Sequence, residues 1–291
     1  SSGWQDATDT SARFNYPRGI AIDPSGTYAV VADFNNHCIR KIVLATKQVT
    51  TLAGSGEVTT LAGQGSFGFK NDTGTSARFD CPYGIDIHPT ENYAVIADSH
   101  NHRIRKIELA TKVVTTLTGN GLSNLKDGTR FKSSFSYPRG IDIDPSGTYA
   151  FITDYSNHCI RKVVLATGEV TTLAGDGTSG LTDDTGTSAR FNYPLGINID
   201  PSGTYAVVAD KNNHCIRKVE LATGEVTNLN YPNSVYSILS DIDIHPSGNY
   251  AVATDYISNN IIKIDLVFQG NNKINDIVIN SDGNSAYVSL E

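Results

Sequence analysis

The sequence predicts an all-β protein in which one four-stranded unit is repeated along the chain, and three observations support this. The stretch GIAIDPSGTYAVVAD begins at Gly19 and returns in related form at Gly84, Gly140, Gly196, Asp241 and, degraded, at Asp276. Within each copy apolar residues recur with a period of two, which is the pattern of a strand. The chain also contains 26 glycines, enough to supply the tight turns that short strands need.

The first copy divides into four strands separated by turns. Ile20 and Ile22 alternate with small or polar residues, which predicts the first strand. The segment 24–26 is Pro-Ser-Gly and predicts a turn, because proline fixes φ and glycine accepts positive φ. The same reasoning places the other strands at 28–32, 38–44 and 49–52, with polar turns at 33–37 and 45–47.

Four short antiparallel strands, repeated around an axis, form the blades of a β-propeller. We expect a single domain over residues 1–291, with blades starting near 17, 82, 138, 194, 241 and 275. Blade five is expected to lack its outer strand. The last blade is expected to be incomplete, with strands only at 276–280 and 285–289. An open edge of this kind invites pairing with a partner or a second copy. Either the chain is part of a longer protein or the last blade is ragged.

A second repeated phrase follows the second strand of each copy. It reads NNHCIRK from Asn35, HNHRIRK from His100, SNHCIRK from Ser156 and NNHCIRK from Asn212. This phrase and its surroundings resemble the NHL-repeat family, named for Asn-His-Leu, although cysteine or arginine replaces the leucine here. In blade five the signature has decayed to 258–260. The resemblance implies a propeller of six blades.

The signature residues are predicted to be structural, because Asp and Asn side chains bond nearby backbone in turns and the histidine bonds within its blade or to the next. They are Asp33, Asn36, His37, Asp98, Asn101, His102, Asp154, Asn157, His158, Asp210, Asn213 and His214. Equivalent residues of different blades are held apart by the symmetry, so no metal site is expected among these histidines.

The cysteines and phenylalanines follow the same repeat. Cys38, Cys159 and Cys215 occupy equivalent positions, too far apart for the ~7 Å Cα separation that a disulfide allows. Cys81 replaces a tyrosine of the other repeats, and a Cys38–Cys81 bridge is the alternative to four buried thiols. Each of the first four expected blades is preceded by a phenylalanine, read either as a plug closing the blade or as a sugar platform: Phe14, Phe79, Phe135 and Phe191.

The innermost strands carry a polar stripe that is the candidate binding site. Its residues are Asp86, His88, Asp142, Asp144, Asn198, Asp200, Asp243 and His245, which line the axis together with Asp23 and Asn280 at the ends of the series. Carboxylates crowded at a channel mouth would attract a hard cation such as Ca²⁺. Alternatively each carboxylate bonds turn amides or channel water, as we expect for the aspartates that precede Pro-Ser-Gly turns.

Function is only coarsely predicted. A net charge of −7 argues against a general nucleic-acid binder, and the sequence has no HExxH, phosphate loop or serine elbow. We expect a non-catalytic interaction or scaffold module without cofactor, extracellular or secreted, with a glycosylation sequon at Asn71. The alternatives are a metal-dependent hydrolase or lyase on the Asp/His stripe, an activity that the resemblance to related propeller enzymes implies, and single-stranded RNA binding. No apolar stretch reaches the ~20 residues of a membrane helix.

Overall fold

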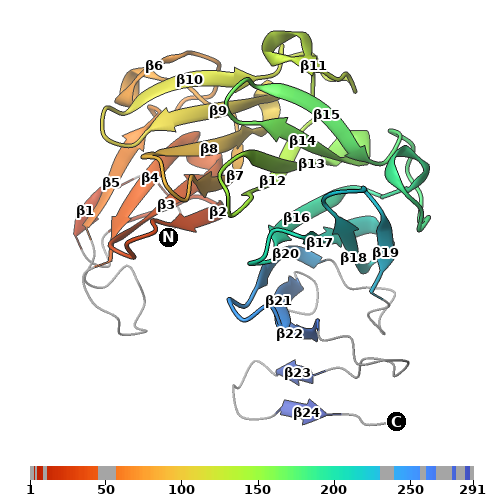
Figure 1. Cartoon of the computed structure of the whole chain (residues 1–291). Coiled ribbons are helices and arrows are strands. Elements are labelled where there is room, and N and C mark those ends of the chain that lie inside the picture. The colour runs from red at the N-terminus through yellow and green to blue at the C-terminus, as the bar shows by residue number, and fades with distance from the viewer. Residues whose placement is uncertain are drawn as a thin grey trace. The chain divides into compact units, whose positions relative to one another are not determined.

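The computed structural model describes residues 3, 5–8, 12–44, 57–229, 239–255, 260–266, 277–279 and 286–288. Over these ranges the chain forms five antiparallel sheets joined by turns and short 3₁₀ helices (Figure 1). The all-β prediction is therefore confirmed, and each sheet is a propeller blade. Among the described residues, no helix has the length and apolarity required to span a bilayer.

The strands follow the repeat, and the first three sheets share one plan. In the first, the order is β1 (Ala7–Thr8), β5 (Glu57–Ala62), β4 (Cys38–Val43), β3 (Tyr28–Asp33), β2 (Pro17–Ile22). In the second it is β6 (Asp72–Thr73), β10 (Val113–Thr118), β9 (Arg103–Glu108), β8 (Tyr93–Asp98), β7 (Pro82–Ile87). In the third it is β11 (Gly128–Thr129), β15 (Glu169–Ala174), β14 (Cys159–Val164), β13 (Tyr149–Asp154), β12 (Pro138–Ile143).

The fourth sheet contains β16 (Pro194–Ile199), β17 (Tyr205–Asp210), β18 (Cys215–Glu220) and β19 (Val226–Asn228). The fifth contains β20 (Leu239–Ile244), β21 (Tyr250–Asp255), β22 (Asn260–Asp265), β23 (Ile277–Ile279) and β24 (Ala286–Val288). Short 3₁₀ helices lie at η1 (Phe34–Asn36), η3 (Gly74–Ser76), η4 (Ser99–Asn101), η5 (Arg130–Lys132), η6 (Tyr155–Asn157), η7 (Gly186–Ser188) and η8 (Lys211–Asn213).

The prediction of six blades is wrong for the described part of the chain. The degraded sixth repeat forms no sheet of its own, because β23 pairs with β22 through Val278 opposite Ile262, and β24 pairs with β23. Blade five therefore has the outer strand that the sequence analysis denied it. The physical reason is that β22 would otherwise present an unpaired edge, and the next alternating segment of the chain satisfies it.

The phrase Val-Thr-Thr-Leu-Ala-Gly occurs twice after the third strand of the first blade, from Val49 and from Val58. The fourth strand of blade one is β5, the second copy of the phrase, rather than the predicted segment 49–52, which lies outside the described residues. The decayed signature at 258–260 likewise lies outside them except for the first residue of β22.

Two compact units make up the chain: Ser1–Ala150 with Val163–Val170, and Phe151–Lys162 with Thr171–Glu291. In unit 1 the inner strand β7 packs against both β2 and β12, and in unit 2 β16 packs against β20. Unit 1 buries Val30, Phe79 and Ile96 in its core. Unit 2 buries a comparable set around Val207 and Ile262. In each unit the core lies between neighbouring sheets, so burial of apolar surface holds blade to blade.

Inner strands approach one another closely at the glycine of the repeated Pro-x-Gly. A Cβ added to Gly84 would lie 2.3 Å from the carbonyl oxygen of Arg139 in the next inner strand. One added to Gly19 would lie 2.7 Å from the carbonyl oxygen of Tyr83. Both distances are shorter than any van der Waals contact, so this position requires glycine because of packing between blades.

Candidate functional site

The repeated phrase builds a buried ion pair in each of the first four sheets. In the first, Asp33 and Arg40 are both fully buried, and their side chains meet at 3.0 Å. The same carboxylate accepts hydrogen bonds from the backbone N–H of Asn15 and from the side chain of Asn36, both at 2.8 Å. Because a buried charge is tolerated only when it is paired and hydrogen-bonded, Asp33, Asn36 and Arg40 form one unit, which we call the Asp–Asn–Arg clamp.

We call the long segment before each of the first four inner strands the leading loop: the described part of 3–16, 63–81, 119–137 and 175–193. In the first, second and fourth sheets the clamp arginine hydrogen-bonds to this loop. Arg40 donates to the carbonyl oxygens of Gln5 and Arg13, both at 2.9 Å, and to the Asp6 carboxylate at 2.7 Å. Both ends of the leading loop are thereby tied to the sheet that it precedes.

The second and fourth sheets repeat the clamp with the same spacing. Arg105 pairs with Asp98 at 2.6 Å and donates to the carbonyls of Lys70 and Arg78 at 3.0 and 3.1 Å. Arg217 pairs with Asp210 and holds the fourth leading loop through the carbonyls of Thr182 and Arg190, both at 2.8 Å. In the third sheet Arg161 pairs with Asp154 at 2.7 Å, and Asn157 donates to the same carboxylate. In the second and fourth sheets Asn101 and Asn213 donate to the carboxylates of Asp98 and Asp210.

The phenylalanines of the leading loops lie against the clamp. The guanidinium carbons of Arg40, Arg105 and Arg217 lie 4.9, 5.1 and 5.1 Å from the ring centroids of the phenylalanines in their own loops. Phe79, Phe135 and Phe191 are fully buried. A buried ring cannot serve as a sugar platform, so these three close their blades, and Phe79 and Phe191 are at the same time cation–π partners of the clamp arginines.

The histidine of the phrase joins one blade to the next. His37, His102 and His158 each end a 3₁₀ helix in the left-handed conformation. Their Nδ1 atoms accept hydrogen bonds, each 3.1 Å long, from the backbone N–H groups of Cys81, Tyr137 and Tyr193. Burial lowers the pKa of all three imidazoles and so favours the neutral form that accepts a hydrogen bond. His214 has the same position and conformation after η8.

The polar stripe also connects neighbouring inner strands. Asp86 accepts a hydrogen bond from Ile87 at 2.8 Å and, with its other oxygen, from the N–H of Ile143 in β12 at 2.9 Å. It also hydrogen-bonds with Asp142, and burial raises its pKa. In unit 2, Asn198 accepts from the N–H of Ile244 in β20 at 3.0 Å. Asp86 and Asn198 thus accept hydrogen bonds from backbone N–H groups of the neighbouring inner strand.

The remaining stripe residues bond within turns or across one boundary. His88 contacts the carbonyl of Gly147 at 2.9 Å through Nε2. Asp144 and Asp200 accept from the N–H groups of Tyr149 and Tyr205, at 2.6 and 2.8 Å. His245 bonds Ser247 at 2.8 Å and stacks on Tyr250, and burial raises the pKa of Asp243. Whether calcium binds any of these carboxylates stays a prediction, and Asn280 lies outside the described residues.

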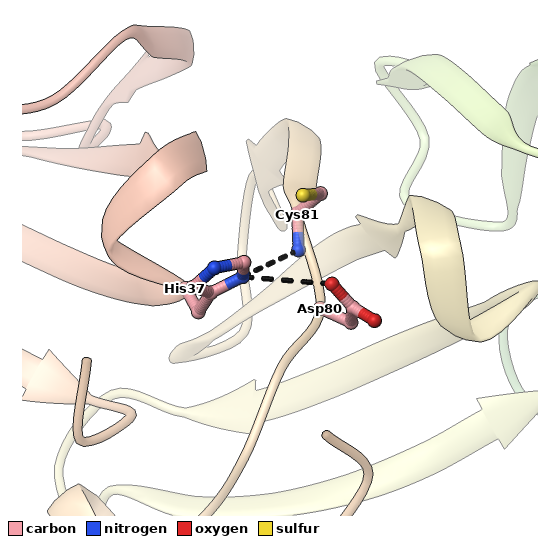
Figure 2. Close-up of side chains that lie close together, drawn as sticks. All are labelled: His37, Asp80 and Cys81. Carbon is pink, nitrogen blue, oxygen red and sulfur yellow. Dashed lines mark hydrogen bonds and ion pairs between the residues drawn. The ribbon is translucent and has the colours of Figure 1, made fainter. Parts of the chain in front are cut away.

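One further cluster lies at the boundary between the first and second sheets, inside unit 1. Figure 2 shows His37 facing Asp80 and Cys81 across that boundary, with Nδ1 of the imidazole 3.5 Å from a carboxylate oxygen of Asp80. One donor atom from each residue lies within 4.8 Å of the others. His100 approaches the same carboxylate oxygen at 3.8 Å. The sequence analysis noted Cys81 as a departure from tyrosine but did not connect it with the other three.

The cysteines are thiols, as predicted. No disulfide joins Cys38, Cys81, Cys159 and Cys215, all of which lie in the described part of the chain and are buried. Burial raises the pKa of Cys81 and of Cys215 to about 12, with Asp80 adding to the effect at Cys81. Thiols in this state are protonated at neutral pH and are poor nucleophiles.

Comparison with known proteins agrees with this geometry. The NHL repeat profile matches residues 14–42, which span β2 to β4 of the first blade and contain its clamp and its histidine. The chain belongs to the NHL-repeat family. It is 30% identical over 236 residues to Protein SUPPRESSOR OF QUENCHING 1, chloroplastic, from Arabidopsis thaliana, which covers 78% of this chain and 22% of the relative. It is 29% identical over 266 residues to NHL repeat-containing protein 2 from Bos taurus, which covers 82% and 36%.

The same fold occurs among solved structures. A chain from a crystal structure of a nidogen/laminin complex superposes with a TM-score of 0.62 at 18% identity, covering 86% of this NHL-repeat chain and 76% of that one. At that identity the likeness shows the β-propeller fold alone. The NHL-repeat chain spans about a third or less of the length of the curated relatives it matches.

Proposed function

We propose that this NHL-repeat propeller is a non-catalytic interaction module that binds a protein partner through its leading loops. The observation that carries the proposal is Phe67, which is 70% exposed although the loop around it is fixed. Its neighbour Gly68 donates to the carbonyl of Phe79 at 3.0 Å and accepts from the side chain of Asn101 at 2.8 Å. A large apolar side chain held in water on an ordered backbone is typical of a contact surface.

Other leading loops repeat the feature with different residues. Leu122 is 63% exposed on the third leading loop and Leu181 is 52% exposed on the fourth. Phe69, on the same loop as Phe67, is 44% exposed, and its ring centroid lies 4.0 Å from the guanidinium carbon of Arg103. The residues of the Asp–Asn–Arg clamp recur in the first four sheets, whereas the exposed apolar residues differ from loop to loop. Variable loops on a constant framework are the usual way in which a rigid fold presents a specific binding surface. That one solved neighbour comes from a nidogen/laminin complex fits a protein as the partner class.

The test compares the wild-type chain with Phe67→Ser, using Ile20→Ser as the matched control. Ile20 is also apolar and 55% exposed, but it lies on β2 rather than on a leading loop. We expect a partner that co-purifies with the wild type and with Ile20→Ser, and whose affinity for Phe67→Ser falls at least ~10-fold when measured with the purified partner. Equal affinity for all three chains would refute the proposal.

An extracellular location belongs to the same proposal and is supported by the sequon at Asn71, whose residue is exposed. A glycan at Asn71 in protein taken from its natural source is the expected result, and an unmodified Asn71 there would count against it. Recruitment of a partner or a second copy through an open last blade stays a prediction. Among the described residues the last sheet ends at β24.

A further inference from the structure

Three departures from the repeat converge at the boundary between the first two sheets. Asp80 stands where other repeats have Asn15, Ser136 and Asn192; Cys81 stands where they have Tyr16, Tyr137 and Tyr193; His100 stands where they have Asn35, Ser156 and Asn212. The scaffold does not require these changes, because His102 and His158 make the same bond to a tyrosine N–H. All three new residues are of metal-ligating types.

The distances within the cluster are close to those of a bound ion. Tetrahedral zinc with bonds of 2.0–2.3 Å holds its donor atoms about 3.3–3.8 Å apart. Asp80 lies 3.5 Å from Nδ1 of His37 and 3.8 Å from Nδ1 of His100. The thiol of Cys81 belongs to the group whose donors all lie within 4.8 Å of one another. His100 lies outside that group of three, so its imidazole must move toward His37 and Cys81 before it can bind the same ion.

The donor set selects the ion. Imidazole nitrogen and thiolate sulfur suit Zn²⁺, whereas Ca²⁺ and Mg²⁺ take oxygen donors. The side chains of His37 and Asp80 are 17% and 24% exposed and that of His100 is 42% exposed, so an ion can reach the cluster from solvent. Aromatic rings border it on the His37 side, where Phe67 lies 5.9 Å away, and on the His100 side, where Tyr137 lies 5.3 Å away.

We propose that His37, Asp80 and Cys81 bind one Zn²⁺ ion, with His100 as the fourth ligand. Binding releases the proton of the Cys81 thiol, because a coordinating thiol is deprotonated by the metal. At Nδ1 of His37 the metal bond replaces the hydrogen bond from the Cys81 N–H. The ion then fastens the phrase of the first blade to the leading loop of the second, next to Phe67.

The experiment uses the full 291-residue chain without a polyhistidine tag, stripped with chelator and titrated with ZnCl₂ by calorimetry. We expect one Zn²⁺ per chain. Titration with CoCl₂ is expected to give the near-ultraviolet charge-transfer absorption of a cobalt–thiolate bond. Absence of stoichiometric binding, or a cobalt complex without the thiolate band, would overturn the proposal.

The informative variant is Asp80→Asn with Cys81→Tyr, which restores the residues that other boundaries carry and so preserves the fold. Its Zn²⁺ affinity is expected to fall at least ~100-fold, since loss of even outer-sphere partners costs 10–100-fold. Cys215→Ser, which removes a buried thiol in unit 2, is the matched control and should bind as the wild type does. His100→Asn is expected to weaken binding but keep the thiolate band. Wild-type affinity in the Asp80→Asn/Cys81→Tyr chain overturns the site, and wild-type affinity in His100→Asn overturns the fourth ligand.

Discussion

The Nδ1 atom of His158 accepts a hydrogen bond from the backbone N–H of Tyr193 at 3.1 Å, and the two rings meet with centroids 4.4 Å apart. Both residues have positive φ, 50° and 57°, so two unfavourable backbone conformations are held by one contact between consecutive blades. An imidazolium has no acceptor nitrogen, so the bond exists only while His158 is neutral.

This bond makes the stability of unit 2 depend on pH. Burial lowers the pKa of His158 below its usual 6.5, so the unfolded chain takes up the proton first as pH falls. The stabilisation is complete above that usual pKa and is lost as pH falls through the lower folded value. His158→Asn keeps an acceptor oxygen, tolerates the left-handed backbone and does not titrate. We therefore expect its free energy of unfolding, measured in urea from pH 7.5 to 5, to fall less steeply than that of the wild type. Parallel pH profiles would contradict this.

Removing the arginine of the Asp–Asn–Arg clamp should lower the free energy of unfolding more than removing any exposed ion pair does. Arg105→Met leaves Asp98 fully buried without its cation and frees the carbonyls of Lys70 and Arg78. We expect a loss of about 3–5 kcal/mol in the free energy of unfolding, the usual cost of an uncompensated buried charge. Lys106→Gln on the same strand removes a partly exposed pair with Glu108 and a cation–π contact with Tyr93, and should cost no more than about 2 kcal/mol. Similar losses for the two variants would show that the clamp does not hold the blade.

Gly84 tests the close approach of inner strands. Gly84→Ala places a methyl group 2.3 Å from a backbone carbonyl that cannot rotate away, and should destabilise by about 3 kcal/mol or more. Gly26→Ala is the control, because Gly26 has φ of 70° and open space around its Cβ position. It should cost only the roughly 1–2 kcal/mol of a left-handed alanine. Thermal and urea unfolding distinguish the two, and an equal effect would place the strain in the backbone rather than between blades.

Asn71 accepts a hydrogen bond from the clamp arginine of its own sheet, as Asp6 does from Arg40 and Asp183 does from Arg217. Its side-chain oxygen accepts from Arg105 at 2.8 Å and from Thr116 at 3.1 Å. Asn71→Asp keeps the oxygen that accepts both bonds and adds a negative charge, so we expect the free energy of unfolding to rise by about 0.5–1 kcal/mol, a gain that shrinks at high salt. Asn71→Ala loses both bonds and should be destabilised. A salt-independent effect of Asn71→Asp would argue against a new ion pair.

The strands and their turns follow from the alternation of residues such as Ile20 and Ile22, which is a local property of the sequence. The number of blades cannot be predicted in this way. The segments at 277–279 and 286–288 have the same strand-like alternation of residues whether they start a new sheet or complete the previous one. Only the unpaired edge of β22 decides between those outcomes, and that is a tertiary property.

The candidate site likewise combines features that the sequence predicts with contacts that only the tertiary structure shows. Repetition identifies Asp33, Asn36 and His37 as one structural phrase, and comparison of repeats singles out Cys81. The role of Arg40 was missed, although an arginine two residues after the Cys or Arg of each phrase was the available signal. What repetition cannot supply is the approach of His100 to Asp80, since that contact depends on side chains absent from the other three repeats.

The short strand that each of the first three leading loops adds to the outer rim of its own sheet has one more consequence. β1, β6 and β11 cover main-chain groups that would otherwise remain available to a strand from another molecule. In the fourth sheet a single bridge between Thr185 and Glu225 takes that place. These segments therefore also block strand-by-strand growth into aggregates, so a change that detaches a leading loop would favour polymerisation as well as disturb the proposed binding surface.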